Sequence, residues 1–284
     1  MNINKLTVIP TELRRISSPP TTLFHAGATL DTLMNRPRVA IVGSRKVSPY
    51  GQQVTHQLAR QLAEQGVVII SGLALGVDSI AHRAALEVKG STLAFLPGPI
   101  EHIYPASHTQ LARQIIDSGG ALLSEYPEGT NSYKHHFITR NRLVAGLAQA
   151  VLITEAAEKS GSLHTARFAK EQGKPVLAVP GNITNPGSEG TNGLIKDYAD
   201  AVTGYEDVLS VLGLKKPLAK TQSVRGSNAA EQKVLDLLIS GLHDGENLLK
   251  HSKLQVHEFN QTLTMLEIGG KIRSLGSNQW GVVH

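Results

Sequence analysis

The sequence predicts an α/β protein built on a doubly wound, mainly parallel sheet. Short aliphatic runs alternate with helix-like stretches from residue 38 to residue 180, and continuous runs of this kind are typical of strands buried on both faces. The runs are residues 38–43, 67–71, 92–96, 121–124, 150–154 and 176–180. Residues 51–66 place Val54, Leu58 and Leu62 at helical spacing. Regular alternation of strand and helix indicates a parallel sheet.

The chain divides into four predicted segments. Residues 1–36 are expected to form an irregular N-terminal arm with one short helix at residues 11–17, and residues 37–212 form the α/β domain. Residues 213–227 carry Pro, Gly, Ser and Lys without periodicity, which predicts a linker. Residues 228–284 contain two amphipathic helices and a hairpin, an order that predicts a small C-terminal winged-helix domain.

The composition restricts the classes of function. The chain has 284 residues and no cysteine, which excludes disulfides, thiolate metal ligands and a cysteine nucleophile. We find no secretory leader and no apolar run of the roughly 20 residues that cross a bilayer, so we expect a cytoplasmic protein without membrane insertion. The net charge is +5, but residues 211–224 alone carry +3. A site for a polyanion must therefore come from local clustering of cations.

One stretch, residues 133–146, gathers cations around an aromatic ring, and no Asp or Glu occurs from Gly129 to Thr154. If the stretch is helical, one face collects Lys134, Phe137, Arg140 and Asn141. Leu143, Val144 and Leu147 then face the sheet. Cations that take phosphates beside a ring that stacks a base are typical of sites for single-stranded nucleic acid. A nucleoside monophosphate site would use the same groups, and a solvated face with Phe137 in the core is the structural alternative.

Small residues follow several of the predicted strands. In parallel α/β sheets the ligand crevice lies outside the carboxyl ends of the strands, where small residues let a ligand approach the backbone. The residues in question are Gly43, Ser44, Gly72, Gly181 and Asn182. Arg45 directly follows the first of these turns, where it can meet a phosphate at the next helix N-terminus. Ser162 and Thr165 add hydroxyls at another helix start, although ordinary turns and capping explain single members of this set equally well.

Candidates for catalysis are few. Asp78 and His82 are four residues apart and could share a metal ion, but no third ligand is evident and a structural hydrogen bond is the favoured explanation. The turns contain no nucleophile beside a base. We therefore expect no enzymatic activity, no metal and no cofactor.

The motifs, taken in order, resemble those of the DNA-processing protein A (DprA/Smf) family of bacteria. They are VAIVGSR, ISGLALGVDSIAHRAAL, GGALLSEYP, F-x-x-RNR-x-x-AGL, SGSLHTA, GKPVLAVPGN and GTNGLI, between residues 38 and 210. The resemblance implies an extended Rossmann-like fold that binds single-stranded DNA, protects it and loads the recombinase RecA during natural transformation. It also implies self-association, with a homodimer as the expected state.

Carried over by position, the resemblance implies DNA contacts at a defined set of residues. These are Gly43, Ser44, Arg45, Lys134, Phe137, Arg140, Asn141, Ser162 and Thr165, with Gly72, Gly181 and Asn182 nearby. The expected recognition helix of the winged-helix domain, residues 254–267, departs from a DNA-binding pattern because it holds Glu258 and Glu267 and no Lys or Arg. A protein contact is at least as good an expectation for that helix.

The alternative class is a nucleotide-binding enzyme of the lysine-decarboxylase-like phosphoribohydrolase group. Those proteins resemble this chain in their Rossmann-type alternation but use a PGGxGT loop and a paired Glu. The corresponding strand end here, LPGPIEHIYP, lacks the second Gly and the paired Glu.

Overall fold

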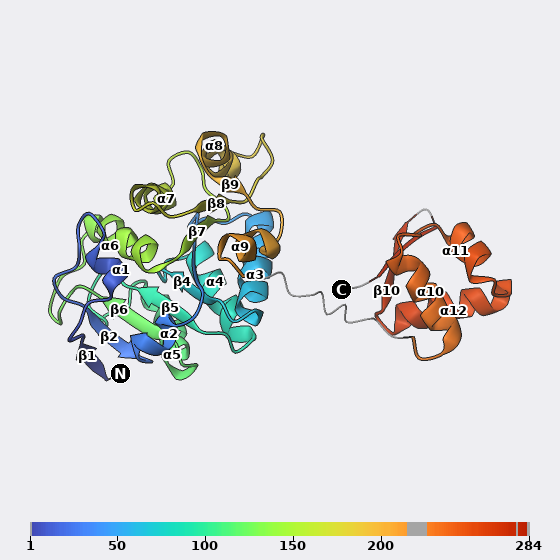
Figure 1. Cartoon of the computed structure of the whole chain (residues 1–284), viewed down its shortest axis with the longest axis horizontal. Helices are drawn as coiled ribbons and strands as arrows, with labels where there is room; N and C mark the ends of the chain where they lie inside the picture. Colours follow the sequence, from blue (N-terminus) through green and yellow to red (C-terminus); the bar gives the residue numbers. More distant parts are fainter. Residues whose placement is uncertain (1, 215–225, 277, 283–284) are drawn as a thin grey trace. The chain divides into compact units, whose positions relative to one another are not determined.

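The computed structural model describes residues 2–214, 226–276 and 278–282, in two compact units that lie within Met1–Lys216 and Pro217–His284. The first unit contains a sheet of nine described strands in the order β1-β2-β6-β5-β4-β3-β7-β8-β9 (Figure 1). Their bounds are β1 Ile3–Lys5, β2 Phe24–Gly27, β3 Arg38–Val42, β4 Val68–Ser71, β5 Thr92–Phe95, β6 Ala121–Ser124, β7 Ala150–Ile153, β8 Val176–Ala178 and β9 Asp200–Ala201.

The strands from β3 to β9 pair in parallel, which confirms the predicted fold class. The six predicted aliphatic runs form β3 to β8. In chain order, β4, β5 and β6 are added on one side of β3, and β7, β8 and β9 are added on its other side. The strand order therefore reverses between β3 and β7. In doubly wound sheets this reversal opens a crevice outside the carboxyl ends of the two strands. The loops that follow β3 and β7 therefore mark the place for a ligand.

Helices cover both faces of the sheet. They are α3 Pro49–Glu64, α4 Val77–Glu87, α5 Thr109–Asp117, α6 Lys134–Leu147, α7 Ser162–Glu171, α8 Glu189–Asp197 and α9 Tyr205–Val211. Alternate residues of β3 point to opposite faces: Val39 and Ile41 pack in the core that includes α3 and α4, and Ala40 and Val42 pack in the core that includes α6 and α7. Burial on both faces explains why these strands are continuous apolar runs.

The N-terminal segment differs from the prediction. Residues 1–36 do contain a short helix, α1 Thr11–Arg14, and a second one, α2 Leu30–Met34. However, β1 and β2 add to the main sheet, because β2 pairs antiparallel with β6 and β1 pairs antiparallel with β2. The expectation of an irregular arm is wrong because strands of three and four residues are too short to show a periodic pattern.

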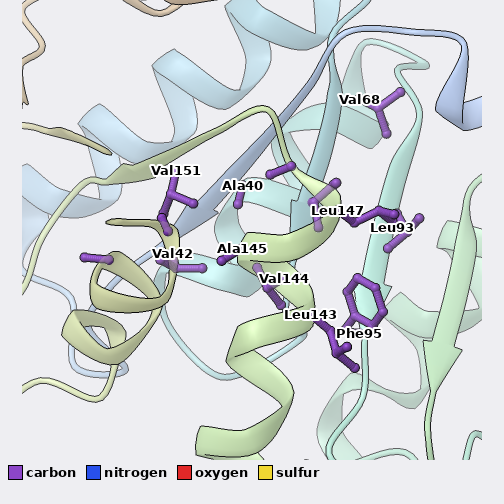
Figure 2. Packing of buried hydrophobic residues seen from close by; sticks show 14 of the residues in the cluster. Ala40, Val42, Val68, Leu93, Phe95, Leu143, Val144, Ala145, Leu147 and Val151 are labelled. Atoms are coloured by element: carbon purple, nitrogen blue, oxygen red, sulfur yellow. The ribbon is translucent and has the colours of Figure 1, made fainter. Parts of the chain in front are cut away.

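Helix α6 packs its C-terminal half on the sheet. Leu143, Val144 and Leu147 are buried against β3 and β5, as predicted from their spacing (Figure 2). Lys174 caps the end of the helix, because its Nζ donates to the carbonyl oxygens of Ala145 (2.9 Å), Gly146 and Ala148 (2.6 Å). Burial lowers the pKa of Lys174 to about 8. The core thus fixes one end of α6, and the other end, at Lys134, is exposed at the carboxyl edge of the sheet.

The second unit consists of three described helices and a hairpin: α10 Ala229–Ile239, α11 Gly245–Ser252, α12 Val256–Ile268, β10 Ile272–Gly276 and β11 Gln279–Val282. Asn228 caps α10 as predicted, since its Oδ1 accepts from the Glu231 N–H at 2.8 Å. Helix α11 is absent from the sequence prediction because eight residues give a weak periodic signal. Most of the predicted linker, residues 215–225, lies outside the described residues. No helix in the described ranges combines the length and apolarity that crossing a membrane requires.

Asp78 and His82 do not form a shared site. Asp78 Oδ2 accepts from the N–H groups of Gly72 (3.1 Å) and Ala74 (3.3 Å), whereas His82 Nδ1 lies 2.6 Å from Thr92 Oγ1. His82 Nε2 is buried without a hydrogen-bond partner among the described residues. Within the same residues, no group of three or more His, Asp and Glu side chains could hold a metal ion.

His82 is expected to reduce stability in acid. Burial, with smaller contributions from His108 and Arg140, lowers the pKa of His82 from 6.5 to about 3. The unfolded chain therefore binds this proton at a higher pH than the folded chain does. The stability associated with neutral His82 is complete above pH 6.5 and falls by at most about 1.4 kcal/mol per pH unit as the pH decreases toward 3. Urea unfolding of the parent and of His82→Asn at stepped pH measures the difference, and equal pH slopes would contradict the prediction.

Candidate nucleic-acid interface

A pocket of about 510 Å³ lies at the carboxyl edge of the sheet, where the strand order reverses. Five segments line it: the turn after β3, the start of α4, the middle of α6, the loop that leads from β7 into α7, and Gly187 in the loop after β8. Seven of the predicted site residues line this pocket, namely Gly43, Ser44, Arg45, Arg140, Asn141, Ser162 and Thr165. Residues far apart in the sequence thus converge on one crevice.

The turn after β3 is held tightly between two neighbouring elements. The Ser44 N–H donates to the Glu155 carbonyl oxygen at 2.7 Å, and the Val77 N–H donates to the Ser44 carbonyl oxygen at 3.1 Å. A Cβ atom on Gly43 would lie 2.6 Å from both the Glu155 carbonyl oxygen and Val77 Cγ2, so a side chain does not fit there. This packing fixes the direction in which Arg45 leaves the turn.

Arg45 lines the pocket and lies against Phe137, which is not one of the lining residues. The guanidinium carbon of Arg45 lies 5.1 Å from the centroid of the Phe137 ring, which is a cation–π distance. Tyr104 meets the same ring edge-on, with centroids 5.3 Å apart, and is itself 55% exposed. Phe137 is half-buried, so its ring is not sealed in the core. Lys134, one turn earlier on α6, is exposed and has no ion pair within the described residues.

Arg140 does not project as a free cation, contrary to the expectation that it grips a phosphate. Its side chain is 4% exposed, and its Nη1 donates to the carbonyl oxygens of Gly72 (2.5 Å) and Phe95. Burial lowers the pKa of Arg140 to about 10, and the charge of Asp78 opposes that shift. Arg140 therefore joins the ends of β4 and β5 beneath the pocket, and Gly72 is buried beside it.

Arg142 also differs from the expected unneutralised patch. Its Nη2 lies 2.6 Å from Glu125 Oε1, and both side chains are largely buried. The neutralising acid comes from the loop after β6, outside the acid-free stretch. Of the three cations in residues 133–146, Lys134 is the exposed one.

Gly181 and Asn182 lie apart from this pocket. They line a second pocket of about 460 Å³ together with Tyr50, Pro180 and Asn185.

The prediction missed two exposed lysines, Lys46 and Lys159, which line the first pocket. Both signals were present, since Lys46 directly follows the Gly-Ser-Arg turn and Lys159 directly precedes the Ser-Gly-Ser turn. Tyr104 was also missed. It lies 33 positions before Phe137 in the sequence, and no local pattern pairs the two rings.

Helices α6 and α7 begin at this edge without an acidic residue in their first turn, whereas the start of α3 already holds the Glu155 carboxylate. Free N–H groups give a helix N-terminus a partial positive charge that favours an anion. At α7 the hydroxyls of Ser160 and Ser162 lie 2.8 Å apart and add polar hydrogens. The edge therefore combines fixed cations, positive helix ends and an accessible ring, which suits phosphates and a base.

The buried acid at this edge is already engaged. Glu155 is 2% exposed, and its carboxylate accepts from the Ser48 N–H at 3.0 Å and from the Ser48 hydroxyl. Ser48 is the N-cap of α3, so Glu155 serves to fix that helix start.

The sequence comparisons identify one family. The family model described as DNA recombination-mediator protein A matches residues 4–213. The chain is 43% identical over 203 residues to Protein Smf of Escherichia coli K12, a match that covers 72% of the chain and 54% of that relative. It is 41% identical over 204 residues to the DNA processing protein DprA of Bacillus subtilis, covering 72% and 68%. The match thus spans little more than half of the first relative's length.

Two solved structures share the fold. One is DNA processing protein A from Helicobacter pylori, solved to explain its mode of binding single-stranded DNA (TM-score 0.67, 37% identity, 74% of this chain and 95% of that one). The other is the Streptococcus pneumoniae DprA (TM-score 0.68, 38% identity, 73% and 74%). Such relatives are named for processing or binding DNA rather than for an enzymatic reaction. The chain therefore belongs to the DNA recombination-mediator protein A (DprA/Smf) family.

Proposed function

We propose that this protein binds single-stranded DNA at the carboxyl edge of its sheet. The observation that carries the proposal is that Arg45, which lines the pocket together with Lys46 and Lys159, lies over the ring of Phe137. Phosphates bind Arg45, Lys46, Lys134, Lys159 and the N-terminus of α7, and one base stacks on the ring of Phe137. Because every base has a π-face, binding is expected to tolerate most sequences.

The salt dependence of binding tests this contact set. With single strands, the logarithm of the binding constant is expected to change by about −0.7 per neutralised phosphate for each unit in the logarithm of salt concentration. Arg45→Ala and Lys134→Ala should each make the slope less negative by about 0.7, the value for one neutralised phosphate. Fluorescence anisotropy with oligothymidylate at stepped salt concentrations measures it.

Arg167→Ala is the matched control for Arg45→Ala. Arg167 also lies over a phenylalanine, with its guanidinium carbon 5.7 Å from the Phe168 centroid, but neither residue lines the pocket. Its loss should leave the slope unchanged. A parent slope near zero, or equal slopes for Arg45→Ala and Arg167→Ala, would contradict the proposed contacts.

We further propose that the bound strand is protected and passed to RecA during natural transformation, and that the protein acts as a homodimer in the cytoplasm. Membership of the family supports these roles. They are tested by RecA ATPase activity on single strands coated with a single-strand-binding protein, and by sedimentation equilibrium. No acceleration of RecA by the parent protein would exclude the loading role, and a monomer at micromolar concentration would exclude the dimer.

For the second unit we propose a winged helix that contacts a protein rather than duplex DNA. Its α12 exposes Glu258, Glu267 and Ile268 (77% exposed) and carries no Lys or Arg. Gel shifts of single-stranded and duplex oligonucleotides with the full chain, and with a chain ending at residue 212, test this. Duplex binding that disappears with residues 213–284 would contradict it.

A further inference from the structure

An exposed aromatic ring lines the second pocket. Tyr50, in the first turn of α3, lines it together with the loop that follows β8. The Tyr50 side chain is 46% exposed, and its hydroxyl donates to the Pro180 carbonyl oxygen at 2.9 Å. This hydrogen bond ties α3 to the loop after β8 and fixes the ring while one face stays accessible. A fixed ring loses little conformational entropy when a planar ligand stacks on it.

The loop opposite Tyr50 offers polar groups that the fold does not use. The side-chain oxygens of both asparagines in the pocket are occupied: Asn182 Oδ1 accepts from the Thr184 N–H (3.0 Å), and Asn185 Oδ1 accepts from the Gly187 N–H (3.0 Å). Within the described part of the chain, their Nδ2 groups donate to no other atom, so they are available to base or phosphate oxygens. Ile183, which lies between them in the sequence, is 87% exposed.

The two pockets are neighbours on one rim. Gly187 lines the first pocket, and its N–H is held by Asn185, which lines the second. An extended strand that leaves the first pocket at Gly187 is therefore next to the second pocket, which Tyr50 lines. We propose that Tyr50 is the stacking platform of a second nucleotide subsite, which receives another base of the same single strand. This inference rests on the proposed function, because it extends the path of the same ligand.

The length dependence of binding separates this subsite from the first pocket. Short oligothymidylates that fill only the first pocket should bind the parent and Tyr50→Ala equally. With longer oligonucleotides the affinity of the parent should rise above that of Tyr50→Ala. The ratio of the two affinities should reach a plateau at roughly fivefold to 150-fold, the range for one stacked base. The salt slope should not change, since no charge is lost. Tyr50→Phe should retain the gain, and Tyr50→Leu should lose it, because the ring and not the bulk is required.

Photo-cross-linking gives an independent readout. An oligothymidylate with a single 5-iodouracil at successive positions should form an adduct at Tyr50, identified by mass spectrometry of peptides. Equal affinity of the parent and Tyr50→Ala at every length would overturn the inference while leaving the first pocket intact. Failure of the parent to bind any single strand would overturn the proposed function and this subsite together. Circular dichroism confirms that the exposed-residue variants remain folded.

Discussion

Replacing Phe137 by alanine is expected to weaken binding of oligothymidylate by about 1–3 kcal/mol, or roughly fivefold to 150-fold in the dissociation constant. Two effects combine in this loss. The base loses its stacking surface, and Arg45 loses the ring that positions its guanidinium at 5.1 Å. Fluorescence anisotropy at one fixed salt concentration measures the change. The salt concentration must be fixed because affinity for a polyanion depends steeply on it.

The control for Phe137→Ala is its effect on folding. Because Phe137 is half-buried beside Tyr104, the variant should lose little stability, and its urea midpoint should stay near that of the parent. Phe137→Trp keeps a larger π-face and is expected to restore binding. Parent-like affinity of Phe137→Ala would show that the ring takes no part in recognition.

Replacing Arg140 by methionine is expected to lower the free energy of unfolding by about 3–5 kcal/mol. The guanidinium and the Asp78 carboxylate grip opposite sides of Gly72, since Arg140 donates to its carbonyl oxygen and Asp78 accepts from its N–H. Removing the cation leaves a buried carboxylate without its neutralising partner and two carbonyl oxygens without a donor. Urea unfolding at neutral pH measures the loss.

A double variant tests this explanation. Asp78→Asn removes the charge that Arg140→Met leaves uncompensated, so the double variant should lose less stability than the two single variants added together. Arg140→Met that is well folded should also keep the parental salt slope of DNA binding. A flattened slope with unchanged stability would instead assign Arg140 to the phosphates, as the sequence alone suggests.

The strands β3 to β8 were predictable because they are buried on both faces of the sheet. A strand buried on both faces is apolar at nearly every position, so continuous apolar runs such as residues 38–43 and 150–154 indicate it directly. The strands β1 and β2 were not predicted, because their few residues pair through backbone hydrogen bonds, which leave no side-chain pattern in the sequence.

The sequence predicted several of the residues that line the pocket, but not which of their side chains are exposed and which are buried. Helical spacing correctly placed Leu143, Val144 and Leu147 against the sheet. The same spacing could not distinguish Lys134 from Arg140, because whether a cation meets solvent depends on the ends of β4 and β5, which come from other parts of the chain. Charge pairs such as Arg142 with Glu125 are likewise set by tertiary structure, so an acid-free stretch of sequence need not be an acid-free surface.

The acid-free helix starts of α6 and α7 have a consequence for evolution and engineering. An Asp or Glu placed in the first turn of either helix would gain about 0.3–1 kcal/mol from the helix dipole. The same carboxylate would repel the ligand from the position it is meant to occupy. Selection for heat tolerance alone should therefore drive this edge toward acidic residues and inactivity, whereas a bound polyanion supplies the missing counter-charge and should raise the melting temperature of the unmodified protein.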